Sequence, residues 1–128
     1  MNLLQNLIHE SLVATGHVEC AAIIRRKDSS IRATSVGYTP SAEQIEAITA
    51  AFKNPPQARE HGIYFNGASY CCIRADKNSV YAKKAKSGFI AVRTTTLIIF
   101  GSYSSSMYPA VCVEAVEKLG EYFREKNK

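Results

Sequence analysis

The stretch GFIAVRTTTLIIFGSY, residues Gly88–Tyr103, guides the interpretation of the rest of the chain. Two runs rich in β-branched and aromatic residues, Phe89–Arg93 and Leu97–Tyr103, flank the short link Thr94–Thr96. This is the pattern of an antiparallel β-hairpin. The second run begins with four consecutive apolar residues, which is typical of a strand buried on both faces and favours a strand over a buried helix. We therefore predict that this strand lies in the middle of a sheet and is covered on both sides.

Three amphipathic helices are predicted from apolar residues that recur at spacings of three and four. The first covers Asn2–Ala14, with Asn2 as its cap, and the second covers Ala42–Phe52, with Pro40 in its first turn. The third, Pro109–Lys126, follows the central hairpin, so we expect it to cover one face of that hairpin. The exposed charges of this last helix are predicted to include Glu114, Glu117 and Glu121.

Short strand-like runs make up most of the remaining chain. Two of them flank a polar turn, and two others flank an Asn-Gly pair, which is the strongest two-residue signal for a β-hairpin. With the central hairpin they give about seven consecutive antiparallel strands, helices at both ends and one inserted helix, which predicts an α+β fold. The runs are Val18–Arg25, Ile31–Val36, Ile63–Phe65, Tyr70–Arg74 and Val80–Lys83.

The composition is that of one globular domain over residues 1–128. The chain is 46% hydrophobic and 21% charged, and no repeat or linker divides it. No apolar run approaches the ~20 residues of a membrane span, and the first residues lack the basic start of a signal peptide, so we expect neither. The cysteines form no CxxC pair, which favours buried, reduced thiols in the cytosol. They are Cys20, Cys71, Cys72 and Cys112.

Residue patterns for catalysis are missing from the sequence. The three histidines, His9, His17 and His61, are scattered and share no spacing that suits zinc. The GxSxG turn of a serine or cysteine nucleophile and the GxxxxGK phosphate loop are both absent. We therefore expect no enzymatic activity, no metal and no cofactor.

Basic residues cluster at two predicted hairpin turns, in a chain of formal net charge +5. Charged turns are common on solvated surfaces, and solvation alone is one interpretation of these clusters. The functional alternative is a surface for phosphorylated lipid head groups, where each basic residue contributes ~1 kcal/mol. Nucleic acid is not expected as a partner, because aromatic stacking platforms are lacking. The first cluster is Arg25, Arg26, Lys27 and Arg32, and the second is Lys83, Lys84, Lys86 and Arg93.

The order of elements and several short motifs resemble the profilin family over nearly the whole chain. The motifs are GIYF at residues 62–65 with Gly67, Tyr70 and Ile73-Arg74 after it, KSGFI at residues 86–90 and EKLGEY at residues 117–122. Two stretches, KNPPQARE through CIRADKNSVYAKK and MYPAVCVEAVEKLGEY, resemble the divergent fourth, testis-enriched branch of animal profilins. The resemblance implies a central antiparallel sheet with the terminal helices packed together on one face and a shorter helix on the other. It also implies three binding activities, for monomeric actin, polyproline segments and phosphoinositides.

The expected polyproline groove of the family is degenerate in this sequence. Polyproline helices dock on aromatic rings, and this chain has no tryptophan. Leu3 and Asn6 stand where the family pattern has a Trp and a Tyr, and Arg32 stands at the Trp of the second strand. Only Tyr122 remains aromatic among these positions, so we expect polyproline binding to be lost or very weak.

The expected actin face of the family is also altered. Arg74 matches a basic position of the family, and with Lys83 and Tyr108 it could form an exposed actin face. However, Glu114 stands where actin-binding members tend to carry Lys, and Lys118 stands where a Glu is common. Charge reversals at an interface can cost several kcal/mol. We therefore expect actin binding to be weak or absent.

The sequence thus favours a cytoplasmic, cytoskeleton-associated and monomeric protein without enzymatic activity. We expect it to bind acidic phospholipids and, by its resemblance, to act in sperm formation. The alternative is an ordinary actin-monomer-binding profilin that regulates actin polymerisation. The expected lipid-binding residues are Arg25, Arg26, Lys27, Lys83, Lys84 and Lys86.

Overall fold

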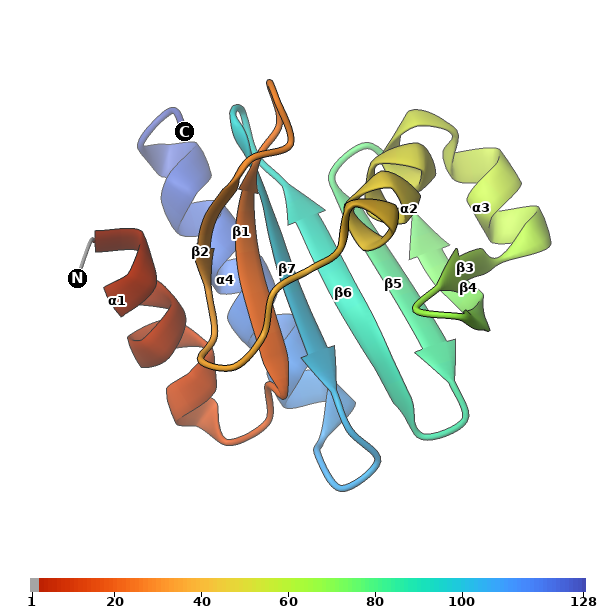
Figure 1. Cartoon of the computed structure of the whole chain (residues 1–128), viewed down its shortest axis with the longest axis horizontal. Coiled ribbons are helices and arrows are strands. Elements are labelled where there is room, and N and C mark those ends of the chain that lie inside the picture. Colours follow the sequence, from red (N-terminus) through yellow and green to blue (C-terminus); the bar gives the residue numbers. More distant parts are fainter. Residues whose placement is uncertain (1–2) are drawn as a thin grey trace.

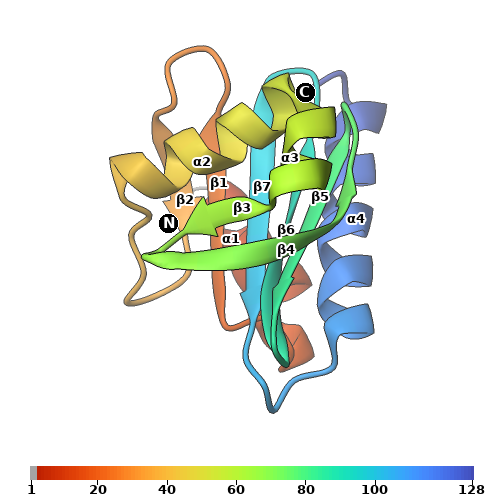
Figure 2. The same ribbon diagram turned by 90° about the vertical axis from the view of Figure 1, so that its right-hand side faces the viewer.

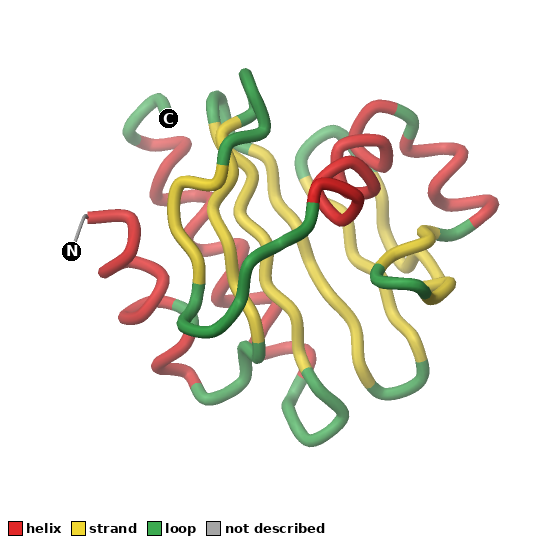
Figure 3. Tube along the Cα trace, in the orientation of Figure 1, coloured by secondary structure: helices red, strands yellow, loops and turns green. Residues whose placement is uncertain are grey.

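The computed structural model describes residues 3–128, so the predicted cap at Asn2 lies outside the described part of the chain (Figure 1). A single sheet is covered by helices on both faces (Figure 3). The elements in chain order are α1 (Leu3–Ser11), the short 3-10 helix η1 (Val13–Thr15), β1 (Cys20–Arg25), β2 (Ile31–Thr34), α2 (Ala42–Lys53), α3 (Pro55–His61), β3 (Ile63–Phe65), β4 (Ala68–Ala75), β5 (Ser79–Lys84), β6 (Ser87–Arg93), β7 (Leu97–Tyr103) and α4 (Pro109–Glu125).

The central hairpin is confirmed, and its second strand lies inside the sheet as predicted. The seven strands run in the order β2-β1-β7-β6-β5-β4-β3, and each neighbouring pair is antiparallel. β7 therefore pairs with β1 on one side and with β6 on the other. Residue pairing runs from Arg25 opposite Leu97 to Cys20 opposite Ser102, and this register fixes which loops meet at each end of the sheet.

Alternate residues of β7 enter two separate cores, which is why its apolar run has no polar positions. Ile98 and Phe100 pack on the face that is covered by α2 and α3. Leu97 and Ile99 pack on the opposite face, under α1 and α4. The edge-on view shows α4 and α2 on opposite sides of the sheet (Figure 2). The predicted arrangement, with both terminal helices on one face and a shorter helix on the other, is confirmed.

The α2–α3 segment differs in detail from the prediction. Pro40 lies before α2, whose cap is Ser41: the Ser41 hydroxyl accepts a hydrogen bond from the Gln44 backbone N–H, and the Gln44 side chain accepts one from the Ser41 backbone N–H. A further helix, α3, follows α2 and begins with Pro55 and Pro56. Asn54 caps α3, and prolines are tolerated in a first helical turn because its N–H groups have no intrahelical acceptor.

The cysteines occupy very different surroundings, and none of the four is in a disulfide. Cys112 is buried against β7, and burial raises the pKa of its thiol to about 12. Cys71 is exposed on β4, whereas its neighbour Cys72 packs partly against the core under α2. Adjacent residues of a strand point to opposite faces, which accounts for the difference between the pair.

Candidate functional site

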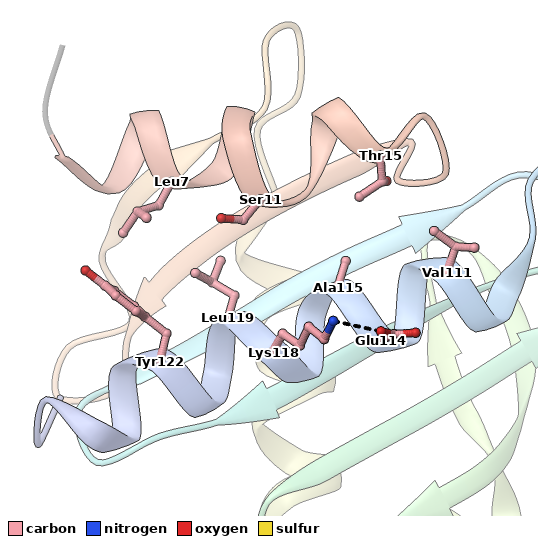
Figure 4. Close-up of a pocket in the computed structure, with 9 residues that line it drawn as sticks. All are labelled: Leu7, Ser11, Thr15, Val111, Glu114, Ala115, Lys118, Leu119 and Tyr122. Atoms are coloured by element: carbon pink, nitrogen blue, oxygen red, sulfur yellow. Dashed lines mark ion pairs between the residues drawn. The ribbon is translucent and has the colours of Figure 1, made fainter.

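A groove of about 570 Å³ runs between α1 and α4 on the face of the sheet that these helices cover (Figure 4). One wall consists of Leu7, Ser11 and Thr15, and the other is formed by residues of α4. The α4 residues are Val111, Ala115, Leu119 and Tyr122, with Glu114 and Lys118 beside them. The lining therefore combines four aliphatic side chains and one aromatic ring with two hydroxyl groups and two charged side chains.

Tyr122 is the member of the predicted polyproline set that lines this groove. Its ring packs edge-on against Phe123, and the Lys126 ammonium lies 5.1 Å from its ring centroid. Leu3 is 62% exposed, and Arg32 and Asn6 are also exposed outside the groove lining. A proline-rich helix needs several aromatic faces, and among the described lining residues only Tyr122 offers one.

Glu114 and Lys118 pair with each other across one turn of α4, with 2.9 Å between carboxylate oxygen and ammonium nitrogen. Both side chains are exposed at the groove (Figure 4). The two charges that were expected to disturb an actin face therefore compensate each other on the surface of α4.

Arg74 lies in a separate network that reaches α4 through β5. Its guanidinium pairs with Asp76 at 2.9 Å and lies 5.3 Å from the ring centroid of Tyr81. The Tyr81 hydroxyl donates a hydrogen bond to the carboxylate of Glu117, and Ser79 donates to the same oxygen at 2.9 Å. Burial and the bond to Glu117 raise the pKa of Tyr81 to about 12.

The expectation that Glu117 is an exposed charge was therefore wrong, whereas Glu114 and Glu121 are exposed. Glu117 lies next to the buried residue Val116, on the flank of α4 that faces β5. Helical spacing alone could have placed it near that flank. The two hydroxyl donors that it meets come from β5, whose position depends on the pairing of distant strands.

Tyr108 lies at the start of α4 and is 68% exposed. Its ring stacks on His17 with 5.0 Å between centroids and 9° between planes. The backbone N–H of Tyr108 donates to Nδ1 of His17 at 2.9 Å. His17 thus joins the loop before β1 to the first residues of α4, a structural role that the sequence did not indicate.

The structure separates the six predicted lipid-binding residues into two groups at opposite ends of the sheet. The register places Arg25 opposite Leu97, beside the β6–β7 turn, whereas Lys83 is opposite Gly88, at the other end of the same strands. In Figure 1 the β1–β2 loop lies at the upper edge of the sheet and the β5–β6 turn at the lower edge. We call Arg25, Arg26, Lys27 and Arg93 the arginine end, and Lys83, Lys84 and Lys86 the lysine end.

Arg93 was predicted beside the lysine turn and is instead at the arginine end. It is the last residue of β6, and β6 runs away from the turn that joins it to β5. Its guanidinium lies 5.5 Å from the ring centroid of Phe52 at the end of α2. The grouping from sequence proximity failed because a strand of seven residues carries its last side chain about 20 Å from its first.

The two ends differ in how their charges are compensated. Arg25 pairs with Asp28 at 2.5 Å, and Arg26 donates hydrogen bonds to the carbonyl oxygens of Thr94 at 2.8 Å and Thr95 at 3.0 Å. The residues of the lysine end are exposed and have no carboxylate partner among the described residues. The lysine end is therefore a set of free cations, whereas the arginine end is partly ordered by its own hydrogen bonds.

Among residues 3–128, no group of three or more His, Cys, Asp or Glu side chains comes together in a way that could hold a metal ion. No helix in this range is long and apolar enough to cross a bilayer.

The sheet, the two terminal helices that pack on one of its faces and the groove between them define a class of protein. Comparison with known proteins identifies this class. A family model described as Profilin matches residues 2–128, and the chain belongs to the profilin family. Profilins are actin-binding, cytoskeleton-associated proteins, and nothing in these comparisons indicates catalysis.

Within the family, the chain is similar to the proteins named Profilin-4. It is 41% identical to mouse (Mus musculus) Profilin-4 and 42% identical to cattle (Bos taurus) Profilin-4, with 99% of each chain covered in both comparisons. Among solved structures, the crystal structure of Acanthamoeba castellanii profilin II matches with a TM-score of 0.86 at 37% identity. That match covers 97% of this chain and 98% of the other.

Proposed function

We propose that this profilin-family protein binds acidic phospholipids through its basic ends, in the cytoplasm, and acts in cytoskeletal or membrane organisation. The observation that carries the proposal is the lysine end, where three exposed lysines have no carboxylate partner among the described residues. From the resemblance to the testis-enriched branch, we include a role in sperm formation in this proposal. In this proposal actin and polyproline segments are at most weak partners, and the protein is a monomer.

The two basic ends act as separate contacts in this proposal. They lie about 20 Å apart along strands of seven residues, so a flat bilayer meets one end at a time. The expected lipid-binding residues are Arg25, Arg26 and Lys27 at the arginine end, and Lys83, Lys84 and Lys86 at the lysine end. Which end contributes more is decided by removing the charges of each end in turn.

Vesicle sedimentation with charge-matched variants tests the proposal. Wild-type protein should pellet at low salt with phosphatidylcholine vesicles that contain phosphatidylinositol bisphosphate. Changing the three expected lipid-binding residues of one end to Gln removes about 3 kcal/mol if all of them contact the membrane, which is roughly a 100-fold loss of partitioning. The triple variant at the other end, which loses the same net charge, is the control.

Two outcomes would refute this function. Wild-type protein could stay in the supernatant at low salt with vesicles that contain the bisphosphate. Alternatively, both triple variants could pellet as the wild type does although circular dichroism shows them folded.

An ordinary actin-monomer-binding profilin is the second candidate, and membership of the family favours it. The Arg74 network is intact and partly exposed beside α4, so a basic contact for an acidic partner is present. Against this, the exchanged charges of Glu114 and Lys118 would face such a partner with the wrong signs at both positions.

Actin polymerisation followed by fluorescence decides between the two candidates. We expect filament growth to be unchanged at protein concentrations at which an ordinary profilin inhibits polymerisation. The double variant E114K/K118E keeps the ion pair and the net charge, and it should gain inhibition if the exchanged charges are the cause. Saturable inhibition by the wild type would instead make actin binding the leading function.

A further inference from the structure

β2 (Ile31–Thr34) is the outermost strand at one end of the sheet, so one of its two long edges has no neighbouring strand. We call this side the β2 edge. The Ser35 backbone N–H donates to the carbonyl oxygen of Ala21 at 2.8 Å, so Ser35 faces β1. Main-chain groups of successive residues in a strand point in opposite directions, so those of Thr34 point out of the sheet. Such groups are a template for pairing with a strand of another chain.

The side chain of Gln5, on α1, binds both outward-facing groups of Thr34. The Gln5 Nε2 amide donates to the Thr34 carbonyl oxygen, and the Thr34 backbone N–H donates to Oε1 of Gln5 at 3.3 Å. In an antiparallel ladder, a residue of the neighbouring strand supplies the same donor and the same acceptor. The Gln5 carboxamide therefore takes the place of a pairing strand at this residue.

His9 holds the Gln5 carboxamide in the required orientation. Nε2 of Gln5 lies 3.2 Å from Nε2 of His9, one helical turn further along α1. The amide nitrogen carries two hydrogens, so the His9 ring nitrogen accepts one and the Thr34 carbonyl oxygen accepts the other. The reversed amide would place an NH2 group against the Thr34 N–H, where two donors repel each other. His9 is thus a positioning residue for the bonds between Gln5 and Thr34.

Two features of β2 itself limit pairing at this edge. The register against β1 passes from Ala33 directly to Ile31, so Arg32 is the extra residue of a β-bulge. Arg32 is also exposed and has no ion pair among the described residues. Bulges and charged side chains are both ways in which natural edge strands avoid association. Neither of them occupies the main-chain groups of Thr34, so this role falls to Gln5.

Exposed apolar side chains flank the β2 edge. Ile31 is 40% exposed at the start of β2, and Val36, two residues beyond Thr34, is 84% exposed. Covering such surface favours association. A second copy of this chain is a suitable partner, because Thr34 offers one donor and one acceptor, and the same edge on two copies is self-complementary about a two-fold axis. Pairing of two such short strands also brings the two Arg32 side chains together, which weakens it.

We propose that the β2 edge is a latent pairing site for β2 of a second copy of this chain, and that Gln5 keeps it closed. The two strands pair antiparallel when the Gln5 side chain no longer binds Thr34. This inference goes beyond the proposed lipid-binding function. It also gives a physical reason for the monomeric state that is part of that proposal.

Sedimentation velocity of Gln5→Met tests this proposal, because methionine keeps the length of the side chain and removes both bonds to Thr34. The wild type should be a monomer from micromolar to millimolar concentration. Gln5→Met should associate at least roughly tenfold more tightly, because the Thr34 groups no longer give up bonds to Gln5 before they pair. Adding Arg32→Thr removes the like charges and should tighten association by up to roughly fivefold more. His9→Ala loosens the amide without removing it and should give a smaller increase.

Matched variants identify the surface that associates. Asn6→Ala changes the exposed neighbour of Gln5 and should stay monomeric. Thr34→Pro removes the outward N–H, and proline is tolerated on the solvent side of an edge strand, so Gln5→Met/Thr34→Pro should return to a monomer. Amide hydrogen exchange follows the same group. The Thr34 N–H should be protected in the wild type, unprotected in dilute Gln5→Met and protected again in the dimer of that variant.

Three results would overturn the proposal. Folded Gln5→Met and His9→Ala could both remain monomeric at millimolar concentration. The dimer could persist in Gln5→Met/Thr34→Pro, which would place the association on another surface. The Thr34 N–H could exchange as fast in the wild type as in dilute Gln5→Met, which would show that Gln5 does not hold the edge. Circular dichroism verifies the fold of each variant, and none of these results bears on vesicle binding.

Discussion

Replacing Phe100 with alanine should lower the free energy of unfolding by about 3–5 kcal/mol. Phe100 is 2% exposed in the middle of β7, and its ring lies within 5.6 Å of the Phe65 and Phe89 ring centroids and 6.1 Å from that of Tyr38. The substitution removes the centre of this aromatic cluster and leaves a cavity between β7 and α2. Urea denaturation followed by circular dichroism measures the loss.

A matched aromatic substitution on the surface controls for the removal of a ring. Tyr64 on β3 is 71% exposed, and Tyr64→Ala should change stability by no more than about 0.5 kcal/mol. A loss of several kcal/mol is a large part of the stability of a small domain, so Phe100→Ala could unfold the protein at 25 °C. Phe100→Leu keeps part of the apolar volume and should give an intermediate loss. Equal effects of Phe100→Ala and Tyr64→Ala would show that Phe100 does not occupy the core.

The elements of this fold could be predicted because their signals are local. The four apolar residues that begin β7 and the Asn-Gly turn between β3 and β4 specify strands without knowledge of any partner. The exception was α3, because Pro55 and Pro56 form its first turn although prolines directly after a helix usually mark only that helix's end. The start of α3 depends on Asn54, which is both the C-cap of α2 and the N-cap of α3.

The candidate sites could be predicted only in part, because they depend on register between distant segments. Arg26 and Arg93 are 67 residues apart in sequence and meet because β7 lies between β1 and β6. Lys53 joins them only because α2 crosses the sheet toward the same end. Local clustering of charge identified the turns next to Arg25 and Lys84 as basic. It could not indicate that these turns are at opposite ends of the sheet.

Placing a methyl group on Gly101 should lower the free energy of unfolding by about 1–3 kcal/mol. A Cβ atom at this position would lie 2.7 Å from Cγ2 of Val116 on α4, which is too close for two carbon atoms. The backbone of Gly101 is not in the left-handed region, so the cost of Gly101→Ala comes from contact with α4 and not from backbone strain. Chemical denaturation of the variant measures this cost.

A double-mutant cycle with Val116→Ala isolates the contact between β7 and α4. Removing Cγ2 of Val116 relieves the clash, so Gly101→Ala should cost less in the Val116→Ala background, with a favourable coupling of about 0.5–3 kcal/mol. Equal costs in the two backgrounds would show that α4 does not lie directly on Gly101.

The Gly101→Ala substitution should also affect Tyr81, because Glu117, which accepts a hydrogen bond from the Tyr81 hydroxyl, follows Val116 in α4. If α4 moves outward to accept the methyl group, Glu117 withdraws from Tyr81, and the pKa of the Tyr81 hydroxyl should fall from about 12 toward its ordinary value.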